Sequence, residues 1–315
     1  MILDAFNGVL ILIFLIGVGF ILGKLKWFDE NSNTLLTRLV VYISLPTFML
    51  SNLTTSFTKE QLIQWSNGFL IVIISILLTY SIGFIITKIF KVSPERKGVF
   101  RSLFGLSNTI FVGLPVNIAI FGEKALPFIL IYYVVNTLSF WSIATYDIRC
   151  DCKDVKGSIL SLDNIKNIFS PPLIAFIFSV VLIMLELSLP KFIIDGCKYL
   201  GSLTTPLSTL FIGSILSTMN FKELALNKDS LLIIIGRFIL SPLITYAFLT
   251  LTNFPILMKQ VFVVMSAMPV MNTSAIVARR YGGDYKFATA MNAVTLIVSF
   301  IFIPIYIFLF QYVFK

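Results

Sequence analysis

Two asparagine-containing segments beside prolines are the parts of this sequence best suited to bind a small polar solute. The first contains Asn108, Gly113, Pro115 and Asn117 within an apolar run. Because proline lacks an N–H and clashes with the carbonyl one turn back, Pro115 beside Gly113 is predicted to interrupt a membrane helix. Irregular backbone at that depth is tolerated only inside the protein or beside a wet cavity. The amides of Asn108 and Asn117 can donate and accept hydrogen bonds there.

A second segment, residues 266–274, has the same character, with Pro269 followed by Asn272 and flanked by hydroxyl side chains. Each segment alone is also explained by a proline kink whose asparagines join neighbouring helices, which is common in membrane bundles. Two such interruptions at corresponding places favour a binding role. If the broken helices cross, their half-helix N-termini carry partial positive charge that favours an anionic group. We therefore predict a site in which Asn108 and Pro115 face Pro269 and Asn272.

The composition places these segments in a membrane protein. Of the 315 residues, 57% are hydrophobic and 12% are charged, whereas soluble domains are about one quarter charged. The apolar residues form long uninterrupted runs instead of periodic stripes. A bilayer core of about 30 Å needs about 20 apolar residues per helix. Ten stretches come close to this length: 5–25, 35–53, 67–90, 99–121, 125–146, 169–187, 197–219, 230–252, 257–279 and 286–312. We predict an all-α membrane protein of about ten transmembrane helices.

The chain divides into two similar halves, residues 1–146 and 169–315, joined by a polar cytoplasmic linker, 147–168. Each proline segment of the first half has a counterpart in the second: 44–47 with 204–207, and 113–116 with 267–270. Because five helices per half is an odd number, the second half must enter the membrane from the opposite side. We predict two inverted five-helix repeats, an architecture typical of secondary transporters.

The basic residues indicate orientation. The net charge of +9 comes from short segments between apolar runs and not from a continuous basic stripe, so nucleic acid is not an expected partner. Lys and Arg concentrate in alternate loops, which the positive-inside rule places in the cytoplasm. We predict a multi-pass protein of the plasma (inner) membrane, surrounded by the lipid bilayer, with both termini external.

Residue types needed for most enzyme chemistry are scarce. The chain has no histidine and three cysteines, which argues against a disulfide framework, a His-ligated metal and a His-based triad. A membrane-embedded enzyme would need buried paired aspartates, a Ser–His pair or an acidic metal motif. We predict no catalytic residues, metal or cofactor, and keep such an enzyme only as an alternative. A channel or receptor is a further alternative, although a channel does not require paired broken helices.

Charged and amide side chains inside the predicted helices bear on coupling. Arg237 lies near the cytoplasmic end of its helix, where it either snorkels or makes a structural contact, or else binds a substrate anion or acts in gating. Asn136 and Asn292 are candidates for interhelical hydrogen bonds. No acid lies near the middle of a predicted helix, and the nearest are Asp147 and Glu186 at helix ends. Since intramembrane acids are the simplest proton or sodium sites, this weakens coupling to either ion without removing it.

The segment Asn108–Pro115, with the pattern N-T-x-x-x-G-x-P, resembles the fourth-helix motif of the auxin efflux carrier family. That family includes plant carriers and bacterial relatives labelled malate permeases. Residues 267–281, from Ala267-Met268-Pro269 to Arg279-Arg280-Tyr281, resemble its ninth helix, and the ten-helix layout resembles the family over the whole chain. The implied fold is similar to that of sodium–proton antiporters and bile-acid transporters.

This resemblance implies a carrier of a small organic anion, auxin-like or malate-like, whose fourth and ninth helices cross at Pro115 and Pro269 beside the substrate. Asn108 matches an asparagine that contacts substrate in the family. The second helix also borders the family's pocket and adds four residues: Ser44, Pro46, Thr47 and Ser51. The resemblance also suggests a homodimer. This chain lacks the long cytoplasmic loop of many plant members.

Taken together, these features predict a secondary carrier that works by alternating access, with rocking or elevator-like movement of the crossed helices. The substrate is expected to be a small organic anion. A proton- or sodium-coupled transporter of another solute is the alternative within the same class.

Overall fold

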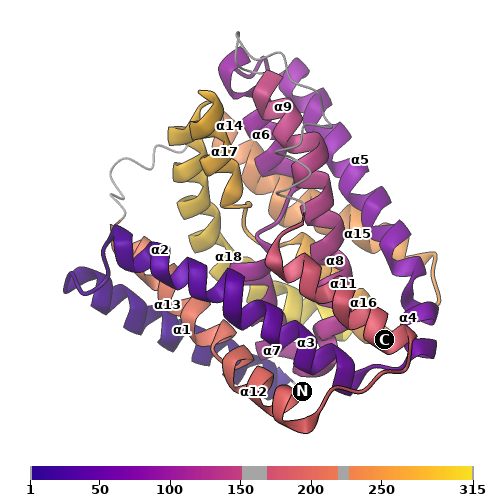
Figure 1. Cartoon of the computed structure of the whole chain (residues 1–315). Helices are drawn as coiled ribbons and strands as arrows, with labels where there is room; N and C mark the ends of the chain where they lie inside the picture. Colours follow the sequence, from indigo (N-terminus) through magenta and orange to yellow (C-terminus); the bar gives the residue numbers. More distant parts are fainter. Residues whose placement is uncertain (1, 151–168, 219–226, 314–315) are drawn as a thin grey trace. The chain divides into compact units, whose positions relative to one another are not determined.

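Helices make up almost all of the described chain. The computed structural model describes residues 2–150, 169–218 and 227–313, and in these no β-strand is found (Figure 1). Within that part, six helical stretches are long and apolar enough to cross a membrane, and four shorter apolar helices accompany them. The all-helical class is thus confirmed, whereas the ten crossings and their inverted repetition stay predictions. Most of the expected linker, from residue 151 to 168, lies outside the described residues.

The chain forms two compact units, and each combines segments from both predicted halves. The units are residues 1–67, 110–130 and 169–219, and residues 68–109, 131–168 and 220–315. Neither unit coincides with a predicted half. The first two predicted helices join their counterparts, the sixth and seventh, in one unit, and most of the remaining helices form the other unit. Residues 113–116 and their counterpart 267–270 fall in different units.

Glycine allows the helices of the first unit to pack closely. Its elements are α1 (Ile2–Lys24), α2 (Glu30–Leu39), η1 (Val40–Ser44), α3 (Leu45–Ser56), α4 (Lys59–Trp65), α7 (Leu114–Phe121), η4 (Glu123–Ala125), α11 (Pro171–Met184), α12 (Lys191–Gly201) and α13 (Thr204–Thr218). Helix α1 packs against α13 and α7, and α3 packs against α11 and α12. A Cβ at Gly213 would lie 2.1 Å from the carbonyl oxygen of Ile16. A larger residue in place of Gly213 in α13 would therefore push α1 away.

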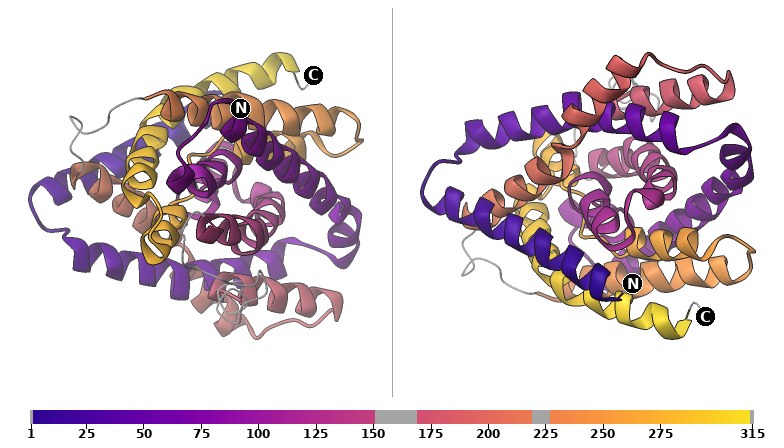
Figure 2. Two further views of the ribbon diagram at one scale, coloured as in Figure 1. Left: turned by 90° about the horizontal axis from the view of Figure 1, so that it is seen from above. Right: turned by 90° about the horizontal axis from the view of Figure 1, so that it is seen from below.

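The second unit is built around a short buried helix, α6 (Lys97–Gly105), whose residues 98–105 are all buried. The other elements are α5 (Asn67–Ile89), η2 (Pro94–Arg96), η5 (Phe140–Ala144), α9 (Thr145–Cys150), α14 (Lys228–Ile235), η7 (Gly236–Leu240), α15 (Ser241–Thr250), α16 (Ile256–Ser266), α17 (Thr273–Tyr281) and α18 (Tyr285–Val313). Helices η3 (Thr109–Gly113) and α8 (Leu126–Ser139) continue from one unit into the other. Helix α6 contacts α9, α14, α17 and α18. The yellow α18 runs beside the orange α14 and α16 (Figure 2).

Three prolines follow π-helical turns without breaking their helices. Pro46, Pro115 and Pro242 each stand two residues after a five-residue π-helix, namely η1, η3 and η7. A wider turn before the proline accommodates its ring and the carbonyl that lost its donor. The prediction that Pro115 and Gly113 interrupt the fourth helix is therefore wrong, because η3 runs directly into α7. The break lies earlier, at residues 106–108.

Candidate functional site

Two helix breaks lie against each other in the second unit. One separates α6 from η3, and the other separates α16 from α17. Ser107 and Val270 form an antiparallel β-bridge between them. The N–H of Asn108 donates to the carbonyl oxygen of Pro269 at 2.8 Å. The crossing is therefore a pair of short extended segments, and it pairs Asn108 with Pro269 instead of Pro115 with Pro269.

Side chains from two further helices satisfy the backbone at the crossing. Asn136 of α8 accepts from the N–H of Ser107 at 3.0 Å and donates to its carbonyl at 2.9 Å. Thr295 of α18 accepts from the N–H of Val270 at 3.2 Å. Unpaired backbone groups are costly inside a membrane protein, so these side chains stabilise the breaks. The predicted interhelical hydrogen bond of Asn136 is confirmed.

Arg237 reaches the same crossing from η7. Its side chain is fully buried. Nη2 donates to the carbonyl of Ser266 at 2.6 Å and to the hydroxyl of Ser107, while Nη1 donates to the carbonyl of Phe104 at 3.3 Å. Nε donates to the carbonyl of Met268 at 3.3 Å. Snorkelling is thus excluded by burial, and Arg237 makes a structural contact with both broken helices.

The outgoing half-helices begin with the same two residue types. Asn108 immediately precedes Thr109, where η3 starts, and Asn272 is the N-cap residue before Thr273, where α17 starts. The side chain of Asn272 makes no capping hydrogen bond and is partly exposed. The N-terminal end of a helix carries about half a positive charge. The amide side chains of Asn108 and Asn272 therefore lie at the two helix N-termini of the crossing, where the backbone carries partial positive charge.

The other residues predicted for the fourth helix lie in the first unit. Gly113, Pro115 and Asn117 belong to η3 and α7. The amide of Asn117 donates to the carbonyl of Gly113 at 2.8 Å, one turn earlier in its own helix. No contact described within a unit joins these residues to the crossing, and their part in a site stays a prediction.

The polar residues of the second predicted helix also lie in the first unit. Ser44 and Ser51 are buried. The hydroxyl of Thr47 donates to the carbonyl of Ile43 at 2.8 Å, and that of Ser51 to the carbonyl of Thr47 at 2.9 Å. These are bonds within one helix, which Ser and Thr commonly make in apolar surroundings. Their predicted role beside a substrate stays a prediction.

Sequence reasoning missed three residues that hold the crossing together: Ser107, Tyr132 and Thr295. Tyr132 is buried with its hydroxyl beside Ser107 and Arg237. It stands one helical turn before Asn136 on the same face of α8, and this spacing was a usable signal. Thr295 had no comparable signal, because its partner is a backbone group 25 residues away in sequence.

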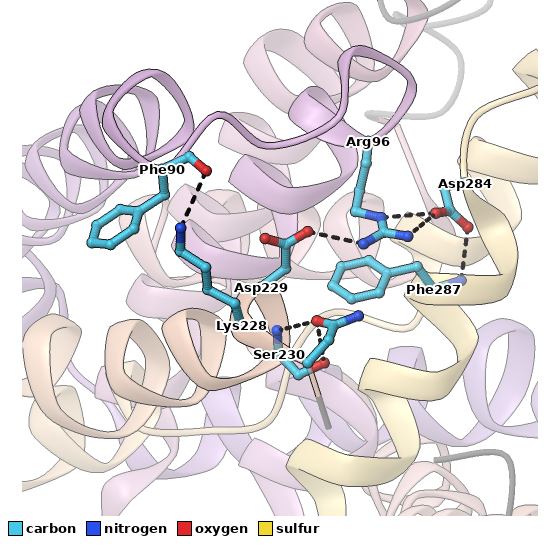
Figure 3. Close-up of polar contacts among 8 residues, drawn as sticks. Phe90, Arg96, Lys228, Asp229, Ser230, Asp284 and Phe287 are labelled. Atoms are coloured by element: carbon cyan, nitrogen blue, oxygen red, sulfur yellow. Dashed lines mark hydrogen bonds and ion pairs between the residues drawn. The ribbon is translucent and has the colours of Figure 1, made fainter. Parts of the chain in front are cut away.

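Three carboxylates of the second unit pair with arginines other than Arg237. Arg96 donates to Asp284 and Asp229 at 2.8 and 2.9 Å and lies over the ring of Phe287 (Figure 3). Burial lowers the pKa of Arg96, but its hydrogen bonds with Asp284 and Asp229 outweigh this and leave the pKa above its usual value. Asp147 accepts from Arg101 at 2.6 Å and from the hydroxyl of Tyr80 at 2.9 Å. Every carboxylate in these pairs thus has a cationic partner.

Comparison with known proteins finds similarity along nearly the whole chain. The family described as "Membrane transport protein" matches residues 4–151 and 153–307. An uncharacterized transporter of Methanocaldococcus jannaschii is 27% identical over 306 residues, which cover 95% of this chain and 96% of that protein. A second uncharacterized transporter, from Methanothermobacter thermautotrophicus, is 24% identical over 303 residues, with 95% and 96% covered. The matched region includes both helix breaks.

Proposed function

Since this chain belongs to the auxin efflux carrier family of membrane transport proteins, we propose that it carries a small organic anion, such as a carboxylate, by alternating access. Family membership makes the chain a membrane transporter, and the names of the family and of its relatives favour transport over an enzymatic role. The substrate class, the plasma membrane location with external termini and the mechanism are parts of the proposal.

The observation that carries this proposal is the pairing of the two helix breaks. Two half-helices start at the crossing, behind Asn108 and Asn272. Each start contributes about half a positive charge, so together they match about one negative charge. A carboxylate has this charge and accepts hydrogen bonds from amide N–H groups. Asn108, which is 6% exposed, is the residue assigned to contact the substrate.

The division into two units supports a movement of one unit against the other. The first two predicted helices share a unit with their counterparts, the sixth and seventh, which suits inverted repeats that exchange conformations. Both helix breaks lie in the second unit, whereas η3 continues into the first. A rocking or elevator movement of one unit against the other would therefore change the surroundings of an anion bound at the crossing.

The proposal is tested by counterflow in proteoliposomes loaded with a panel of mono- and dicarboxylates and the neutral amides of the same acids. We expect saturable exchange of at least one carboxylate and rejection of its amide. Replacing Asn108 by Ala removes a hydrogen bond to a charged group and should lower transport by about tenfold or more. The matched control is Asn253→Ala, the same change at an exposed loop residue of the second unit. Unchanged transport in Asn108→Ala would contradict the site, and non-saturable flux would indicate a channel.

A further inference from the structure

Arg237 is a buried charge without a carboxylate partner. No Asp or Glu of the described residues forms an ion pair with it, and its partners are the hydroxyls of Ser107 and Tyr132 and three backbone carbonyls. An uncompensated charge in a membrane interior is costly. The compensation must therefore come from the backbone.

The three carbonyls belong to the ends of the two incoming half-helices. Phe104 lies in the last turn of α6, Ser266 is the last residue of α16, and Met268 follows it in the break. A helix C-terminus carries about half a negative charge, so two such ends supply about the one negative charge that a guanidinium needs. Arg237 also pairs carbonyls that would otherwise have no donor.

In secondary carriers with broken helices, half-helix C-termini and unwound carbonyls are the groups that coordinate a coupling cation. In this chain a guanidinium already binds these groups, and arginine does not lose its proton in proteins. We propose that Arg237 is a tethered cation that replaces a coupling sodium ion at the crossing, so that anion transport needs no sodium. This inference rests on the proposed carrier function.

The guanidinium of Arg237 is not available to bind a substrate anion. All three guanidinium nitrogens donate to protein groups, and the side chain has no exposed surface. It acts as a positioning residue that holds Ser107 and both incoming helix ends. The substrate is then left to the outgoing helix starts and their asparagines.

The first test uses the wild-type protein, which avoids any loss of folding. Counterflow of the accepted carboxylate is measured in matched sodium, potassium and choline buffers. We expect the transport rates in the three buffers to agree within about twofold. Loss of a required coupling ion would lower the rate by about tenfold or more, which corresponds to about 1.4 kcal/mol. A requirement for sodium would overturn the proposal.

The second test removes the guanidinium and returns it from solution. Arg237→Ala leaves a space, whereas Arg237→Met fills it with a flexible apolar chain. Both variants should lose about tenfold or more in transport. Guanidinium ion should restore transport, and raise the thermal unfolding midpoint in detergent, in Arg237→Ala but not in Arg237→Met. Equal responses of both variants, or full transport by Arg237→Ala without added cation, would overturn the proposal.

A third variant keeps the proposal testable if Arg237→Ala does not fold. Arg237→Lys retains the charge with three donors, and it should transport without sodium at a reduced rate. A gain of sodium dependence in this variant would contradict the tethered cation.

If no carboxylate is moved by the wild type in any buffer, the carrier function fails, while the effect of guanidinium on the unfolding midpoint of Arg237→Ala still decides the role of Arg237.

Discussion

Arg237 and Arg96 lie in the same unit but are bound by different kinds of partner. Arg96 pairs with Asp229 and Asp284, and the three side chains are 24%, 16% and 25% exposed (Figure 3). Arg237 is 0% exposed and pairs with carbonyls at the crossing. A carboxylate suits a site that water partly reaches, whereas helix ends compensate a charge where water does not reach.

This difference bears on how a carrier keeps its crossing intact. A carboxylate at the crossing would add a titratable group and a second charge to desolvate. Backbone dipoles are fixed by the helices and cannot be protonated. The crossing thus gains a permanent cation without a group that changes charge with pH, while Asp229, Asp284 and Asp147 pair with Arg96 and Arg101.

The largest effect is expected from Arg237→Leu. Removing this side chain leaves the buried carbonyls of Phe104, Ser266 and Met268 without this donor. Each unsatisfied buried acceptor costs about 1–3 kcal/mol, so we expect a loss of about 3 kcal/mol or more. The free energy of unfolding in detergent should fall by that amount. The matched control is Arg96→Leu, for which we expect a clearly smaller loss. Equal losses in the two variants would remove the distinction between the two arginines.

Asn136→Leu should have an intermediate effect, because it unpairs the backbone of Ser107 while keeping a similar volume. Two hydrogen bonds are lost in a buried place, and we expect a loss of about 2 kcal/mol in the free energy of unfolding. The control is Asn52→Leu, since the amide of Asn52 donates to the carbonyl of Phe48 in its own helix at 3.1 Å. The same denaturation curves measure both variants. A larger loss in Asn52→Leu would show that the crossing contributes little to stability.

The helical class and the approach of Asn108 to Pro269 could be predicted from the sequence. Asn108 and Pro269 were expected to meet, and their backbones do form a hydrogen bond. The break itself was misplaced, because the two halves were aligned on their prolines. Aligning them on the Asn-Thr pairs at 108 and 272 places the break at 106–108 opposite residues 270–272, which lie within the second break.

The rest of the site had no local signal. No residue near Pro115 in the sequence shows that a π-helical turn accommodates this proline, because the formation of that turn depends on how η3 packs against its neighbours. The role of Arg237 depends on carbonyls more than 100 and about 30 residues away in sequence, and carbonyls are present at every residue. The sequence offered one hint, an arginine within a mostly apolar helix, and this hint did not identify the partners.

The smallest effect is expected from Arg96→Gln. The cluster is partly exposed, so its ion pairs contribute about 1 kcal/mol to the free energy of unfolding and are weakened by salt. Raising the salt concentration should therefore reduce the difference between Arg96→Gln and the wild type, while the difference between Arg237→Leu and the wild type stays constant, because buried charges are screened much less. Lys59→Gln is the control, since its pair with Glu186 is 37% and 72% exposed and should contribute nothing measurable. A salt-sensitive loss in Arg237→Leu would mean that water reaches the crossing, and backbone dipoles alone would then not account for its charge.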